Sequence, residues 1–171
     1  MKGFNMSILK FVYKNKRHDL YEMYNYLINP AKTSYDSFIG FNVNPANPIP
    51  EMQLVQNYYH YPYRDNSYKT YQQVIFSFDN YIDGHFLPIR DICVEIGLAL
   101  LGDEQRQIFA SIHFFGTSSI HCHYMINYVD INGNLYRQKY SIYYYKTKIN
   151  TILSKYRLPL IKIYTFEKYS H

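Results

Sequence analysis

The chain has 171 residues, of which 18 are Lys or Arg and 13 are Asp or Glu, and its net charge is +5. This length fits a single compact domain over residues 1–171, and two cysteines are too few for a disulfide framework, so we expect a protein of the reducing cytoplasm. No stretch approaches the ~20 apolar residues of a membrane helix, and Lys10 and Lys14 interrupt the apolar N-terminal run, so neither a signal peptide nor membrane insertion is expected.

Patterns of apolar residues divide the first half of the chain into strands and helices. The strand candidates are rich in β-branched and aromatic residues, whereas Leu20, Met23 and Leu27 recur at helical spacing. Pro30 ends that helical run. The elements expected, in chain order, are a strand over 7–13, a helix over 15–29, a short strand over 38–43, a helix over 50–59 and a strand over 68–79.

The second half of the chain predicts two further helices and two further strands. Ile89, Ile92 and Ile96 form one face of a helix, and Gly102 suits its C-cap. The elements expected are a helix over 88–103, a strand over 106–113, a strand over 120–130, a turn over 131–134 and a helix over 141–158. A short loop joins the two strands, so they are expected to pair antiparallel, and the mixture of elements predicts an α+β fold.

Three of the seven histidines fall between positions 113 and 123. Side chains alternate across a strand, so His121 and His123 are expected on one face and Cys122 on the other. If the strands over 106–113 and 120–130 pair antiparallel, His113 at the end of the first lies beside the start of the second, and the three imidazoles converge. Such a set suits a divalent transition metal such as Mn²⁺ and leaves coordination positions for substrate. A chance cluster of histidines in an ordinary α+β protein is the competing interpretation.

The segments "SIHFFGTSSIHCHYMINYVD" and "NYLINPAKT" resemble the relaxase (mobilisation nuclease) domain of mobilisable plasmids and conjugative elements, a branch of the HUH endonucleases. In that family, a strand ending in His, a short loop and a His-x-His strand that runs into Asn form the metal motif. The residues that match this motif are His113, His121, His123 and Asn127. The resemblance covers roughly residues 8 to 161, and it implies a central antiparallel β-sheet with helices packed mainly on one face.

The resemblance implies an enzyme that nicks and rejoins one DNA strand at a transfer origin. A tyrosine becomes joined to the 5′ phosphate, and the residue that matches its position in the family is Tyr26, with Tyr24 as second choice. A divalent cation, Mn²⁺ or Mg²⁺, would neutralise charge on the scissile phosphate. The implied partners are single-stranded DNA and accessory relaxosome or coupling proteins.

The expected contacts with DNA come from basic and polar residues near these motifs. The cluster "KNKRH" contributes Lys14, Lys16 and Arg17, and Lys32 and Asn127 complete the expected set. Lys and Arg at phosphates release counterions, and the 22 tyrosines offer stacking platforms for bases.

Two departures from the family pattern keep other interpretations open. Phe115 stands where an acidic residue usually follows the first histidine, and the loop between His113 and His121 is one residue longer than the commonest form. In addition, Gln72 and Gln73 lie on a strand where some relatives carry an acid. A relative that binds DNA without cutting it is therefore one alternative, and an HUH protein of rolling-circle replication or transposition is another. The early position of Tyr26 favours a relaxase, because those other groups usually carry the tyrosine after the histidines.

Overall fold

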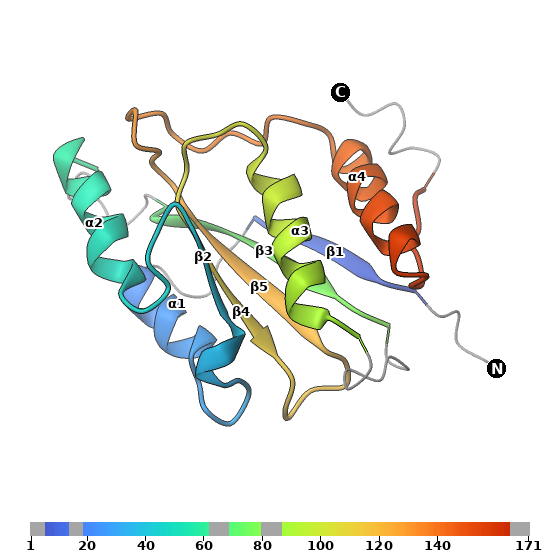
Figure 1. The fold of residues 1–171 in the computed structure, drawn as a ribbon. Helices are drawn as coiled ribbons and strands as arrows, with labels where there is room; N and C mark the ends of the chain where they lie inside the picture. Colours follow the sequence, from blue (N-terminus) through green and yellow to red (C-terminus); the bar gives the residue numbers. More distant parts are fainter. Residues whose placement is uncertain (1–5, 14–18, 62–68, 80–86, 165–171) are drawn as a thin grey trace.

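Five strands form one antiparallel sheet in the computed structural model, which describes residues 6–13, 19–61, 69–79 and 87–164 (Figure 1). The strands are β1 (Ile8–Val12), β2 (Phe38–Phe41), β3 (Tyr71–Ser77), β4 (Ile108–His113) and β5 (His121–Asn127). Their order across the sheet is β1-β3-β5-β4-β2, and every neighbouring pair is antiparallel. The pairing predicted between the two histidine-bearing strands is confirmed.

The helices of the described residues also lie where the sequence predicts them. They are α1 (Leu20–Leu27), α2 (Pro48–Tyr58), α3 (Ile89–Leu101) and α4 (Ile142–Lys155), and a short 3-10 helix, η1 (Tyr35–Ser37), was not predicted. Helix α1 begins later than expected because Asp19 has an extended backbone and its side chain accepts a hydrogen bond from Glu22 N, which makes it the N-cap. At the C-terminal end of α3, Gly102 has a φ of +60° and forms the expected C-cap.

Apolar side chains fill both faces of the sheet. Ala110 and Tyr124 belong to one apolar cluster with residues of α3 and α4, whereas their neighbours Phe109 and Met125 belong to a second cluster with residues of α1 and α2. The α+β fold with a central sheet is confirmed, but the expectation that helices cover mainly one face is wrong. Strand β4 is buried at every position, and its buried residues include the polar side chains of Ser111 and His113.

The cover on the α1 and α2 face is incomplete. Helix α1 packs over β4, whereas two residues of β1 on that face are exposed, namely Ile8, which is 57% exposed, and Lys10. Ile75 and Ser77 of β3, on the same face, are half-buried. This half of the face therefore presents sheet side chains rather than a helix.

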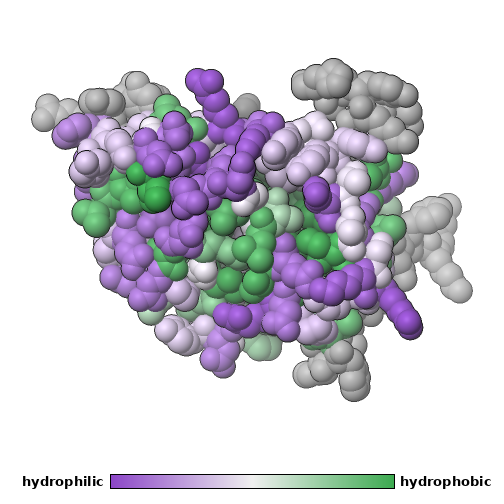
Figure 2. All heavy atoms as spheres, turned by 45° about the horizontal axis from the view of Figure 1, so that its top comes forward, coloured by the Kyte–Doolittle hydropathy of each residue, from purple (hydrophilic) through white to green (hydrophobic). Residues whose placement is uncertain are grey.

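Hydrophilic side chains cover most of the surface in the view of Figure 2, with smaller hydrophobic patches between them. Among the described residues, no helix has both the length and the apolar character needed to cross a membrane.

Candidate metal centre

The three predicted histidines meet at one end of the sheet. Strand β4 ends at His113 and β5 begins at His121, and the two residues are register partners. His123 lies on the same face two residues later, and each histidine offers one nitrogen such that all three nitrogens lie within 4.8 Å of one another. The ring centroids of His113 and His123 are 4.6 Å apart. The predicted convergence is therefore confirmed, and the cluster can hold a metal ion.

Backbone carbonyls orient two of the rings. His113 Nε2 donates to the carbonyl oxygen of Leu27 at 3.0 Å, and His121 Nδ1 donates to that of Ser119 at 2.9 Å. These bonds leave His113 Nδ1 and His121 Nε2 as the nitrogens with lone pairs. His113 Nδ1 is buried and has no hydrogen-bond partner among the described residues. A buried polar atom of this kind is normally satisfied, so a metal ion fits its position.

Gln73 orients the third ring. Its Nε2 lies 2.9 Å from His123 Nδ1, and both residues are buried. An amide nitrogen only donates, so in this arrangement His123 Nδ1 accepts the bond and the ring proton lies on Nε2. Coordination through His123 Nε2 requires the Gln73 amide to turn over, so that its Oε1 accepts from Nδ1–H. The two amide orientations occupy the same space.

Burial keeps His113 neutral. The pKa of His113 is lowered to about 4, chiefly by loss of hydration and also by the nearby charges of His121 and Lys32, against the opposing effect of the Leu27 hydrogen bond. A neutral imidazole is the form that coordinates metal. The ring is therefore ready to bind a cation at pH 7 without first losing a proton.

The segment after α1 is tied to the end of β4. Thr33 Oγ1 donates to the carbonyl oxygen of Ile112 at 2.6 Å, and the backbone N–H of Phe114 donates to that of Lys32 at 2.8 Å. Ser111 Oγ also donates to the carbonyl oxygen of Leu27, at 2.8 Å. These bonds hold the C-terminal end of α1 and the segment after it against the end of β4 that carries His113.

Of the two candidate tyrosines, Tyr26 lies at the cluster. Its ring centroid is 5.6 Å from that of His113 and 5.4 Å from that of His123, and Lys32 Nζ lies 4.3 Å from the centre of the same ring. Tyr24 points toward β4 instead, where its ring is 5.4 Å from Phe109. The pKa of Tyr24 is raised by partial burial and by the nearby Tyr35. Residues two apart on a helix diverge by ~200°, so only one of these tyrosines faces the histidines.

Asn127, expected at the DNA surface, is instead fully buried. Its side-chain oxygen accepts from Gln56 Nε2 at 2.8 Å, and its nitrogen donates to the carbonyl oxygen of Met52 at 3.1 Å and to Gln107 Oε1 at 2.9 Å. These bonds join α2 to the sheet, so the DNA-binding role predicted for Asn127 is wrong.

The other expected contacts are placed as follows. Lys32 lies at the histidine cluster, as the Tyr26 contact shows. Lys14, Lys16 and Arg17 lie outside the described residues. Phe115, at the position where the family usually has an acid, is 57% exposed and does not belong to the cluster.

The sequence placed Gln73 only on a strand where some relatives of the relaxase family carry an acid, and its contact with His123 was not predicted. The sequence feature that could have indicated this contact is the polar side chain of Gln73, two positions before Ile75 on a largely apolar strand. The role of the Leu27 carbonyl had no signal in the sequence, because any residue at that position supplies the same oxygen.

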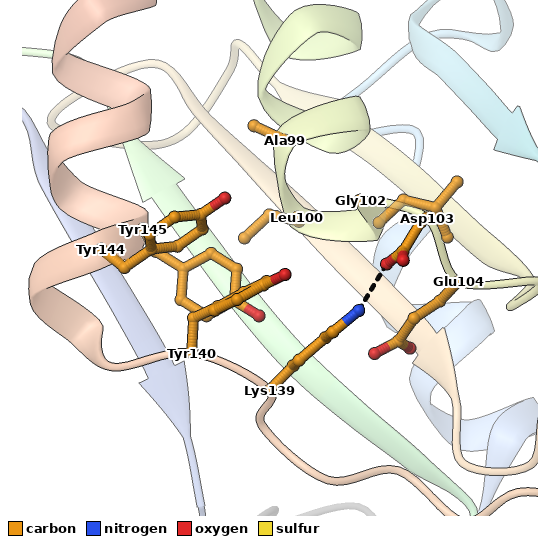
Figure 3. A pocket seen from close by; sticks show the side chains of 10 residues that line it. Ala99, Leu100, Gly102, Asp103, Glu104, Lys139, Tyr140, Tyr144 and Tyr145 are labelled. Carbon is orange, nitrogen blue, oxygen red and sulfur yellow. Dashed lines mark hydrogen bonds and ion pairs between the residues drawn. The ribbon is translucent and has the colours of Figure 1, made fainter. Parts of the chain in front are cut away.

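A separate polar cavity of about 210 Å³ lies between the end of α3 and the start of α4 (Figure 3). Lys139 and Asp103 form an ion pair of 2.6 Å there, and Tyr140 stacks on Tyr144. None of its lining residues belongs to the histidine cluster, and α3 and α4 cover the opposite face of the sheet. The cavity is therefore not part of the candidate centre.

No protein-family model matches the chain, and comparison with curated proteins finds no match. A function can accordingly be inferred only from the arrangement of the histidines, Tyr26 and the elements that hold them.

Proposed function

We propose that this chain is a relaxase-type nuclease that nicks and rejoins single-stranded DNA through Tyr26. One observation carries the proposal: the ring of Tyr26, from α1, packs against His113 and His123, which come from two adjacent strands. A tyrosine hydroxyl and a three-histidine cation site are the two groups that this chemistry requires, and distant segments of the chain supply them.

The proposed step is a transesterification. The oxygen of Tyr26 attacks the scissile phosphorus, the bond from phosphorus to the 3′ oxygen breaks, the phenol loses its proton and the 3′ oxygen gains one. The enzyme is then joined to the 5′ phosphate. A divalent cation held by His113, His121 and His123 would neutralise charge on the phosphate. A phenol has a reference pKa of ~10, so phenolate leaves more readily than an alkoxide and the link stays reversible.

Lys32 supports the same proposal. Its ammonium lies 4.3 Å from the centre of the Tyr26 ring, and it carries a positive charge into the space that an anionic phosphate would occupy. An enzyme of this class would act in the cytoplasm on one strand at a transfer origin, together with relaxosome or coupling proteins. An HUH protein of replication or transposition would use the same chemistry, and the position of Tyr26 before the histidines favours the relaxase.

A relative that binds DNA without cutting it is the second candidate. One observation favours it: among the described residues, the cluster contains three histidines and no carboxylate, and Gln73 is the side chain that orients His123. A neutral amide raises the basicity of a ligand less than a carboxylate does. A weaker cation site would then serve binding more readily than cleavage.

The test is a search for a covalent protein–DNA adduct. The protein is incubated with Mn²⁺ and a library of labelled single-stranded oligonucleotides, and any adduct is resolved on denaturing gels and mapped by peptide mass spectrometry. We expect an adduct on Tyr26 that disappears in Tyr26→Phe and His121→Ala but persists in Tyr24→Phe, the matched control on the same helix. Retained DNA and metal binding without any adduct would instead support the non-cutting relative.

A further inference from the structure

The face that carries the histidines continues across β3 to the edge strand β1. Antiparallel partners point their side chains to the same side of a sheet. Two rows of partners therefore run from the cluster to the edge, and they are His113–His121–Ser77–Ile8 and Ser111–His123–Ile75–Lys10. Ile8, Lys10, Ile75 and Ser77 thus form a strip of side chains, here called the β1–β3 strip, that is continuous with the candidate centre.

Exposure rises steadily along these rows. His113 is fully buried, His121 and Ser77 are half-buried, and Ile8 is 57% exposed. On the other side of the cluster, Tyr26 packs against two of the histidines, and the carbonyl end of α1 bonds to His113. A long substrate that reaches the centre is therefore expected to approach it over the β1–β3 strip.

The charge of the strip favours an anionic substrate. Lys10 is its only charged residue, and neither row contains Asp or Glu. Lys10 is exposed, and none of the ion pairs found among the described residues includes it. Neighbouring strands lie about 4.8 Å apart, so two strand steps separate the Cα atoms of Lys10 and His123 by about 10 Å. A flexible lysine at that distance can reach a phosphate near the one that is cut.

We propose that the β1–β3 strip is the surface along which single-stranded DNA runs to the candidate centre, and that Lys10 contacts a phosphate of that strand. The identity of the ligand rests on the proposed function. Ile8 and Ile75 supply apolar contact for sugars and bases, while Lys10 supplies the charge. Such contacts with the backbone are independent of base sequence, so the strip would position the strand without selecting the nick site.

The experiment measures binding of a fluorescent single-stranded oligonucleotide by anisotropy, with Mn²⁺ present, over a series of salt concentrations. Lys10→Ala is expected to weaken binding several-fold and to reduce the slope of log K against log[salt] by about 0.7, the value for one lost contact with single-stranded DNA. Lys10→Arg is expected to keep both values close to those of the wild type. Lys148→Ala removes an exposed lysine from α4, which covers the opposite face, and is the matched control.

A second pair of variants tests the strip by adding a positive charge. The result then does not depend on whether the edge strand β1 tolerates the loss of Lys10. Ile8→Lys is expected to tighten binding and to increase the salt slope by about 0.7. Leu98→Lys, at a residue of α3 that is 53% exposed, introduces the same charge on the opposite face and should change both values much less. Size-exclusion chromatography checks that all variants keep the wild-type oligomeric state, because lysines on edge strands also prevent strand pairing between molecules.

The outcomes separate this inference from the proposed function. Equal affinities for Lys10→Ala, Lys148→Ala and the wild type would overturn the strip, even if a Tyr26 adduct forms. A wild-type protein that binds no single-stranded DNA would overturn it as well. Selective weakening in Lys10→Ala without any adduct would support the strip and remove the cleavage step from the proposed function.

Discussion

At the scale of single residues, hydrogen bonds determine which nitrogen of each histidine can bind a cation. The backbone oxygens of Leu27 and Ser119 accept hydrogen bonds from the rings of His113 and His121, and no side-chain substitution at Leu27 or Ser119 removes these oxygens. His123 differs, because its partner is the side chain of Gln73. Among the groups that orient the three rings, Gln73 is therefore the one whose side-chain substitution is expected to change the metal affinity.

Gln73→Ala is expected to lower the affinity for Mn²⁺ by about 10- to 100-fold, because His123 loses the partner that fixes its ring. Gln73→Glu should raise the affinity above that of the wild type, since a carboxylate accepts firmly from Nδ1–H and leaves Nε2 as the ligand. Isothermal titration calorimetry measures both changes. Gln105→Ala, at an exposed glutamine, serves as the control. If Gln73→Ala bound Mn²⁺ as tightly as the control, Gln73 would have no part in the site.

At the scale of elements, buried polar side chains join helices to the sheet. Thr33 connects the segment after α1 to the end of β4, and Asn127 connects α2 to β4 and β5 through both atoms of its amide. Arg106, also buried, donates to the carbonyl oxygens of Asn127 and Tyr128, at the end of β5 opposite to His121. These contacts position the elements on which the candidate centre lies.

Asn127→Asp is expected to lower the free energy of unfolding by about 3 kcal/mol, because a carboxylate cannot donate to Met52 or Gln107 and each buried acceptor left without its donor costs about 1–3 kcal/mol. Urea unfolding followed by circular dichroism measures the change. Asn57→Asp makes the same replacement at an exposed residue of α2 and should stay within about 0.5 kcal/mol of the wild type. A loss of DNA affinity without a loss of stability would restore the role originally predicted for Asn127.

At the scale of the whole molecule, one sheet separates two apolar cores, and the histidines lie on the side with the smaller one. The cluster is therefore partly enclosed by α1 but reachable across β3 and β1. Enclosure also links the titration of His113 to global stability, because the folded protein accepts a proton on that ring less readily than the unfolded chain does.

The metal-free protein should accordingly lose stability as the pH falls from about 6.5, where the unfolded chain begins to protonate His113, toward about 4, where the folded protein does so as well. Urea unfolding in EDTA at intervals across this range measures the slope. His113→Asn removes the group and should flatten the slope, whereas His60→Asn, at an exposed histidine, should keep it because His113 is unchanged. Identical slopes for the wild type and His113→Asn would contradict this account.

Features that depend on local backbone geometry were predictable from the order of the residues. Side chains alternate along any strand, so His121 and His123 had to share a face and Cys122 had to lie on the other, where it is fully buried. The short loop after His113 likewise made antiparallel pairing predictable, and helical spacing identified the buried residues of α1.

The tertiary structure alone decided which distant groups meet. Neither spacing nor composition shows that helices cover both faces of the sheet, that Asn127 is buried under α2, or that Gln73 contacts His123. The rotation of α1 against β4 places Tyr26 at the histidines and Tyr24 at Phe109. Helix rotation and helix cover follow from the packing of complementary side chains across the whole core, and no local pattern in the chain encodes them.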